Sequence, residues 1–355
     1  MIGHDARARG AALIIASALG FAVSSMIVRR AADDGLDTCA ITFYVGCVRF
    51  VLCLLVVLAR GDLRNKALCG GQGWAFLALC TVRQGIGAFS ILAAFVAFAR
   101  IPIGNATVLL FTSPVWTTCL AFCCLGERVT RTGQVAAVLV CLGVALVAHT
   151  SASGDATQAA TEAVAANGGA RASKGATTAV VGTVFALLAS VSDACFYVAT
   201  RAIGNRQDSV TLTMWMGFSI ITTVGPLCML VGVPLGSEHV ERGTMLSLAA
   251  GGTASLLANV FFNLGLERLE AAPANVLGAL QVPIGFVIQV LLGQPCSPVA
   301  VLGATVIVVC ALAVTLTKPE PAAAAAREDG DAEDAFPLLG RAGTWTKVLA
   351  VDHLE

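Results

Sequence analysis

The sequence has few charged residues, and their signs balance. Only 12% of the 355 residues are charged, with 22 Lys and Arg against 22 Asp and Glu, while 57% are apolar before glycine is counted. A soluble domain carries about 25% charged residues, so this chain lacks the polar side chains to cover a large soluble fold, and disorder, a collagen repeat and a coiled coil are excluded too. Without net positive charge there is no electrostatic footprint for nucleic acid. An integral membrane protein remains.

Clustered metal ligands are also missing. The four histidines are scattered, and no CxxC pair with partnering histidines occurs. Most of the 13 cysteines fall inside long apolar runs, where cysteine behaves as a small hydrophobic residue. We therefore expect no disulfide scaffold, no metal and no other cofactor.

Ten apolar runs are long enough to cross a bilayer, which needs about 20 residues per helix. They are continuous, whereas the strands of a barrel alternate apolar and polar residues. The first run is longer than the apolar part of a signal peptide, so we expect it to be retained. The sequence thus predicts an all-α integral membrane protein with ten transmembrane helices, at about residues 11–28, 39–59, 74–98, 104–125, 133–150, 178–200, 210–234, 244–266, 271–292 and 298–317.

Two segments lack such runs. Residues 151–177 are rich in Ala, Gly, Ser and Thr, which is typical of a flexible linker, and they divide the spans into five and five. Residues 318–355 turn acidic after a proline- and alanine-rich stretch, which predicts a disordered tail. We therefore expect a first repeat at 1–150, the linker, a second repeat at 178–317 and the tail. No soluble catalytic domain fits into this chain.

Basic residues are unevenly distributed among the loops. If the N-terminus is cytoplasmic, 14 Lys and Arg lie on the cytoplasmic side and six on the other. Because loops rich in Lys and Arg stay in the cytoplasm, we predict a multi-pass membrane protein with both termini cytoplasmic.

The fourth and ninth spans share a pattern. Each begins near an asparagine, Asn105 or Asn275, and reaches a proline, Pro114 or Pro283, after nine or eight residues. Proline inside a helix removes a hydrogen bond and kinks the axis, and kinked helices at matching places in two halves indicate a substrate site at the midplane. An odd number of spans per half predicts inverted repeats. The alternative is that Ala- and Leu-rich helices look alike by composition and that the kinks serve packing alone.

Residues 97–147 resemble the end of an EamA-type repeat. They contain PIGNAT, FTSPV and LGE ahead of the fifth span, and residues 277–295 are similar to the ninth helix of the eukaryotic solute-carrier branch. The chain thus resembles the drug/metabolite transporter superfamily, and the resemblance implies ten helices arranged as two inverted five-helix repeats. The family glutamate is Glu127 in the first half and is replaced by Gln294 in the second. We expect Glu127, beside a helix end, to be structural, with substrate binding as the alternative.

Three charged residues fall well inside the spans: Arg49, Arg83 and Asp193. A charge at the centre of a span costs about 2.5–3.5 kcal/mol on insertion scales, so such residues usually face the bundle interior and pair or bind a ligand. Arg49 resembles an arginine common in the family and is either structural or part of the substrate or gating site. Arg83 either snorkels to the headgroups or belongs to the site. Asp193 either pairs with an arginine or exchanges a proton during transport.

Uncharged polar residues complete the candidate site. Asn259 and Asn263 are one helical turn apart and share a face, and each polar candidate can instead act as interhelical glue. We expect Tyr197 to be a packing residue, and the small residues Gly20 and Ser24 to mark a close helix contact. The candidates for substrate binding or gating are Arg49, Arg83, Asn105, Thr112, Ser113, Pro114, Asp193, Asn259, Asn263, Asn275, Gln281 and Pro283.

These features predict a secondary transporter of a small polar metabolite that works by alternating access. Two arginines against one aspartate favour an organic anion or a zwitterion, with coupling to a proton or a counter-substrate. One alternative is an intramembrane enzyme acting on a lipid-linked substrate, but the clustered acid–base side chains that it needs are missing. Another is a scaffold or receptor that works through its tail.

The tail contains a short pattern that resembles an acidic dileucine sorting signal. Asp334 precedes Leu338 and Leu339 with the spacing of such signals. A working signal would direct the protein to an endolysosomal or vacuolar membrane. The plasma membrane and other endomembranes remain open.

Overall fold

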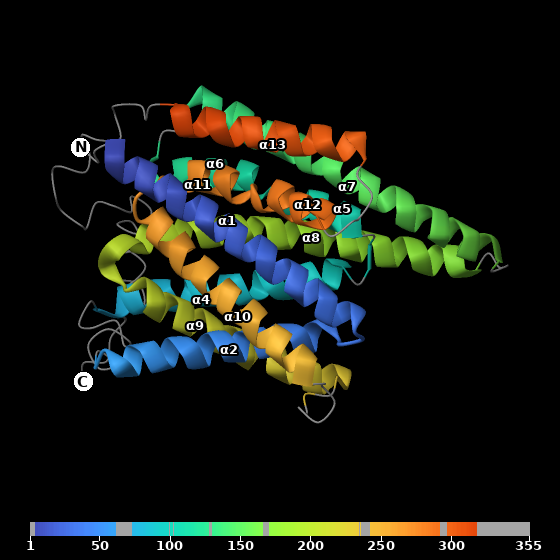
Figure 1. The fold of residues 1–355 in the computed structure, drawn as a ribbon, viewed down its shortest axis with the longest axis horizontal. Helices are drawn as coiled ribbons and strands as arrows, with labels where there is room; N and C mark the ends of the chain where they lie inside the picture. The colour runs from blue at the N-terminus through green and yellow to red at the C-terminus, as the bar shows by residue number, and fades with distance from the viewer. Residues whose placement is uncertain are drawn as a thin grey trace, which may run out of the picture.

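The computed structural model describes residues 4–61, 73–98, 100–101, 103–127, 130–165, 170–233, 235, 242–291 and 297–317. Regular structure in these ranges is entirely helical, and ten stretches are long and apolar enough to cross a membrane. The long helices lie side by side as one bundle (Figure 1). The predicted all-α membrane fold with ten spans is confirmed.

Among the spans in the described ranges, eight are single helices and two are broken. The single helices are α1 (His4–Asp33), α2 (Thr38–Ala59), α4 (Gly73–Phe98), α7 (Arg131–Ala165), α8 (Ala170–Ile203), α9 (Ser209–Val231), α10 (Arg242–Leu266) and α13 (Pro298–Leu316). The fourth span consists of α5 (Ile103–Leu110) and α6 (Ser113–Leu125), and the ninth of α11 (Ala271–Gly278) and α12 (Gln281–Leu291). A 3-10 turn, η1 (Gly204–Arg206), joins α8 to α9.

The two breaks lie beside the two prolines at which the sequence predicts kinks. Pro114 is the second residue of α6 and Pro283 the third of α12, and both are buried. Since proline has no amide hydrogen, the regular helical bond is lost there. The chain closes each break with tighter bonds, from the Thr112 amide to the carbonyl of residue 109 (3.2 Å) and from the Val282 amide to the carbonyl of residue 279 (3.0 Å). Each span is therefore bent but keeps its backbone largely hydrogen-bonded, as a membrane interior requires.

The packing interleaves the two halves of the chain. α1 packs on α10, α4 on α8, α2 on α9, α7 on α13, and α6 on α11. If each of the first five spans corresponds to the span five places later, α1 corresponds to α8 and α4 to α10. The contact between α1 and α10 then has its counterpart in the contact between α8 and α4. Each of the other three pairs joins two spans that correspond to each other. The arrangement is thus consistent with inverted repeats, whose boundaries stay a prediction.

Two of these helix pairs approach closely at glycines. At the crossing of α7 and α13, a Cβ atom on Gly303 would collide with the carbonyl oxygen of Gly143. At the crossing of α2 and α9, a Cβ on Gly217 would lie 2.8 Å from the backbone nitrogen of Phe50. Small residues at such crossings let backbones pack by van der Waals contact, which drives helix association in lipid.

The predicted close contact of the first span is with α10. A Cβ on Gly20 would lie 2.9 Å from the Cβ of Ala258. The Ser24 hydroxyl donates to the carbonyl of Gly251 over 2.9 Å.

The segment 151–177 differs from the predicted flexible linker. α7 continues to Ala165 and α8 begins at Ala170, so most of the segment is helical. Its ten alanines explain the difference, because alanine has the highest helix propensity and is also common in flexible linkers. The tail 318–355, with Asp334, Leu338 and Leu339, lies outside the described residues.

Both ends of the described chain lie at one end of the bundle, here called the terminal end (left in Figure 1). The Arg7 guanidinium donates to the carbonyl of Thr317 over 2.6 Å, joining the start of α1 to the residue after α13. This contact agrees with an even number of spans.

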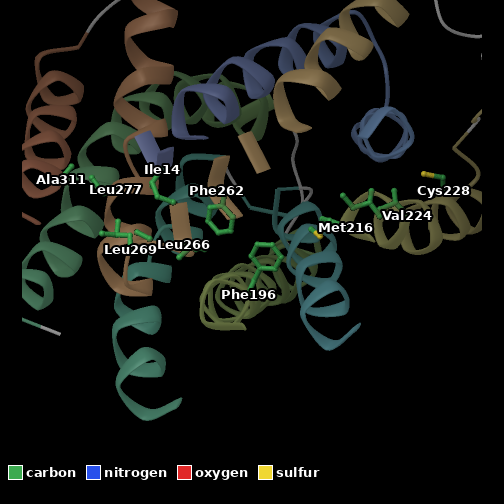
Figure 2. Close-up of a cluster of buried hydrophobic side chains, with 12 residues drawn as sticks. Ile14, Phe196, Met216, Val224, Cys228, Phe262, Leu266, Leu269, Leu277 and Ala311 are labelled. Carbon is green, nitrogen blue, oxygen red and sulfur yellow. The ribbon is translucent and has the colours of Figure 1, made fainter. Parts of the chain in front are cut away.

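A large buried apolar cluster connects helices across the bundle, from α13 to α9 (Figure 2). It brings together Ile14 of α1, Phe196 of α8, Met216 of α9, Phe262 of α10 and Leu277 of α11. The rings of Phe196 and Phe262 are stacked, with centroids 5.8 Å apart. Three of these side chains, Ile14, Phe196 and Phe262, also border the cavity described next.

Candidate functional site

Two adjoining cavities of about 200 Å³ each lie beside the helix breaks. One is bordered by α1, α8 and α10, and the other by α4, α5, α6 and α8, with residues around the α11–α12 break lining both. Both are lined by Asp193 and Tyr197 of α8, Gly278 at the end of α11 and Gln281 at the start of α12. Because they share four lining residues, we describe them together as the central cavity.

Five of the predicted candidates line this cavity: Ser113, Asp193, Asn259, Asn275 and Gln281. The Asn275 amide connects the two broken spans by donating to Thr117 Oγ1 (2.6 Å) and Ser113 Oγ (3.3 Å). Asn259 uses one amide hydrogen on the carbonyl oxygen four residues earlier, at 3.0 Å. Sequence-distant polar residues therefore meet where the breaks were predicted.

Asp193 is the single charged residue on the cavity wall within the described part of the chain. No described Lys, Arg or His forms an ion pair with its carboxylate. The predicted pairing with an arginine is therefore not observed. A carboxylate in this position is available to a ligand or a proton. The described residues include no group of three or more His, Cys, Asp or Glu side chains that could hold a metal ion.

Arg83 lies behind the wall rather than on it. Its side chain is buried to 1% exposure, so it does not snorkel to the headgroups. The guanidinium donates to Thr200 Oγ1 (2.9 Å), Gln84 Oε1 (3.2 Å) and Asn263 Oδ1 (2.9 Å). It also stacks on the Phe196 ring, 4.2 Å from its centroid. Arg83 and Asn263 thus join α4, α8 and α10 and support the aromatic wall from outside the cavity.

Arg49 is also absent from the cavity wall. It is buried, donates through Nη2 to Ser255 Oγ, and leaves Nε without a partner. Because neither arginine lines the cavity, the arginine count gives no support for an anionic substrate.

The remaining candidates shape the breaks. Thr112 Oγ1 donates to the carbonyl of residue 109 (2.7 Å) and lies 2.8 Å from Ser190 Oγ, which fixes the first break against α8. Pro114 and Pro283 are buried beside the breaks and do not border the cavity. The side chain of Asn105 lies outside the described residues.

Glu127 forms a buried ion pair at the terminal end of the bundle. Its Oε1 accepts from Arg201 Nε over 3.0 Å, with side-chain exposures of 10% and 4%. Its Oε2 accepts from the amide of Ala271 (3.1 Å), at the first residue of α11. Arg201 Nη1 donates in turn to the carbonyls of Leu266 (2.7 Å) and Glu267 (3.0 Å). This set of bonds, here called the clasp, joins the ends of α6, α8 and α10 to the start of α11.

One residue of the cavity and one of the clasp are not among the candidates predicted from the sequence. Tyr197, expected to be a packing residue, lines the cavity, and its hydroxyl would be 2.6 Å from a Cβ on Gly278. Arg201 looked like an ordinary basic residue after the sixth span. The family motif pointed to Glu127, but only the fold shows which cation faces it.

Comparisons with known proteins point to the family that the sequence motifs resemble. Residues 8–149 match the EamA-like transporter family. Human solute carrier family 35 member G1 is 23% identical over 278 residues, which cover 78% of this chain and 70% of that protein. A solved crystal structure shares the fold with a TM-score of 0.67 at 17% identity, covering 87% of this chain and 98% of the other. The resemblance noted in the motifs is thus confirmed: residues 8–149 form an EamA-like domain, and the chain as a whole is similar to a solute carrier of family 35.

Proposed function

We propose that this chain is a secondary carrier that moves a small polar metabolite by alternating access through the central cavity. Its family supports membrane transport of small solutes. The observation that carries the proposal is the cavity itself, which lies between the two breaks and is lined by polar groups of both halves. Broken helices at corresponding places in two halves are the usual position of a carrier's substrate site.

The clasp supports alternating access, because it fits the contact that closes one side of the cavity. Three layers lie between the cavity and the terminal end. They are the Asn275 hydrogen bonds to Ser113 and Thr117, the apolar cluster of Ala121, Val198 and Ala271, and the Glu127–Arg201 pair. Opening on this side requires α6 and α11 to move apart, which breaks all three layers.

Uptake into proteoliposomes tests the proposal. The purified chain should accumulate at least one labelled small metabolite, with a dependence on a proton gradient or a counter-substrate measured in the same vesicles. Asp193→Asn should abolish uptake. The matched control is Glu270→Gln, which also removes a carboxylate but from a partly exposed pair with Arg7 at 3.6 Å, where little effect is expected. Absence of flux for every metabolite class, together with turnover of a lipid-linked substrate, would replace the carrier by the enzyme alternative.

We further propose that the terminal end faces the cytoplasm. The shared position of the two chain ends and the bias of basic residues support this orientation. Glycosylation tags placed within 151–177 should be modified, whereas tags within 318–355 should not. The reverse pattern would invert the topology.

The membrane in which the carrier works is tested through the tail. If Asp334, Leu338 and Leu339 form a sorting signal, Leu338→Ala combined with Leu339→Ala should move the protein from endolysosomal or vacuolar membranes to the cell surface. An unchanged distribution would show that the pattern arose by chance.

A further inference from the structure

We infer that the central cavity binds a small zwitterion whose ammonium group pairs with the Asp193 carboxylate. The inference rests on the proposed carrier function, since it assigns a substrate class to the same cavity. The two arginines and one aspartate within the spans favoured an organic anion and a zwitterion equally, whereas the cavity wall favours the zwitterion. Three features of the wall lead to it.

The first feature is an uncompensated negative charge. Asp193 lines both parts of the cavity and forms no ion pair with a described side chain. A carboxylate within a span is costly unless it is paired or hydrated. A ligand ammonium group would supply the missing partner, whereas a ligand carboxylate would be repelled by it.

The second feature is the aromatic and apolar wall around that charge. Phe21, Tyr197 and Phe262 border the same cavity, and the Tyr197 and Phe262 rings meet edge to face at 4.8 Å. Aromatic rings attract cations within about 6 Å, so these rings add to the attraction that the carboxylate exerts on an ammonium group. Each of the two adjoining parts of the cavity, at about 200 Å³, suits a molecule of amino-acid size.

The third feature argues against a simple cation. Arg83 lies directly behind Phe196, whose ring borders the cavity, and has no acidic partner among the described residues. Its positive charge disfavours a ligand that carries only positive charge. Gln281 lies at the N-terminus of α12, lines both parts of the cavity, and has no described protein partner. Its amide can donate to the ligand's carboxylate, while Asp193 pairs with the ligand's ammonium group. The wall therefore offers a separate partner for each charge of a zwitterion.

Ligand-induced stabilisation tests this inference without requiring transport. The full chain in phosphatidylcholine nanodiscs is melted with three groups of probes: zwitterions (amino acids and betaine), cations (choline and putrescine) and anions (succinate and citrate). A ligand that binds the folded state raises the melting temperature in proportion to its affinity. We expect at least one zwitterion to raise it and neither of the other groups to do so. Stabilisation by an anion or a simple cation, or by no zwitterion, would overturn the inference.

Variants locate the binding. Asp193→Asn should weaken binding of the stabilising zwitterion by about 30-fold or more, as expected when one partner of a buried charge pair is removed. Asp193→Glu, which keeps the charge, should retain part of the affinity and guards against a folding defect in Asp193→Asn. Glu270→Gln should bind like the wild type. Unchanged binding by a folded Asp193→Asn would contradict the inference.

The two proposals fail in different ways. Zwitterion binding without flux in vesicles would remove the carrier function and leave the assignment of the cavity intact. Flux of anions that survives Asp193→Asn would leave the carrier standing and remove the zwitterion.

Discussion

The clasp and the central cavity each contain a carboxylate at α8, but only the carboxylate of the clasp forms an ion pair with a described residue. Asp193 and Arg201 lie eight residues apart on α8, about two helical turns. At the clasp, the Glu127 carboxylate is bonded to Arg201 and to the Ala271 amide. In the cavity, Asp193 has no described cationic partner. The difference teaches that a charge satisfied by the protein holds helices together, while a charge left unpaired beside a cavity is available to a ligand.

Breaking the clasp should have the largest effect on stability. Arg201→Ala leaves Glu127 buried without its cation and frees two carbonyls, so we expect a loss of about 3–5 kcal/mol in unfolding free energy. Thermal and denaturant unfolding of the purified chain would measure it. Adding Glu127→Gln should recover part of the loss, because the uncompensated charge is then gone.

The matched control for the clasp is Arg60→Ala. Arg60 pairs with Asp208 at 3.7 Å, but half of its side chain is exposed, so the expected loss is at most about 1 kcal/mol. Equal losses for Arg60→Ala and Arg201→Ala would show that burial does not distinguish the two pairs.

Replacing Arg83, which supports the cavity wall from behind, should lower the free energy of unfolding less than breaking the clasp. Arg83→Lys keeps the charge but loses the planar fork that reaches Thr200, Gln84 and Asn263. We expect a loss of about 1.5–3 kcal/mol in unfolding free energy, with binding of the zwitterion retained because Arg83 does not border the cavity. A variant of wild-type stability that no longer binds would place Arg83 in the binding site instead.

Gly278→Ala should disturb the cavity more than the bundle. The new methyl group would lie 2.6 Å from the Tyr197 hydroxyl and push the ring into the cavity. Such overpacking costs about 1–3 kcal/mol, and binding or uptake should fall with it. Gly85→Ala is the control, since nothing lies within 4 Å of its Cβ position and alanine suits a helix better. Normal binding by Gly278→Ala would mean that Tyr197 does not shape the site.

The smallest effect concerns Glu267, a carboxylate just outside the spans next to the clasp. Burial raises its pKa, while a hydrogen bond from Ser209 and the charge of Arg268 partly oppose that shift. Because its pKa is higher in the folded than in the unfolded state, the residue lowers stability as pH rises above its unfolded value of about 4.3. Glu267→Gln should therefore flatten the fall of melting temperature between mildly acidic and neutral pH. An unchanged slope would assign the fall to other groups.

Much of the architecture could be predicted because it depends on local properties of the sequence. The spans follow from the length of apolar runs, and the breaks follow from Pro114 and Pro283. The segment 151–177 was misjudged because an alanine-rich composition suits both a flexible chain and a helix. For the buried charges, the insertion cost predicted an inward position, yet it did not separate Arg83, bonded to neutral groups, from Asp193, left on the cavity wall.

The sequence by itself determined that this chain has ten spans, that two of them bend beside prolines, and that its repeat resembles a transporter family. Only the tertiary structure decided which charges meet. Arg201 is 74 residues from Glu127 in sequence, and Arg83 is 180 residues from Asn263. Such pairings depend on how α4, α6, α8 and α10 pack, and apolar periodicity carries no information about a partner on another helix. The cavity, in which Asp193 has no cationic partner among the described residues, is a product of that packing.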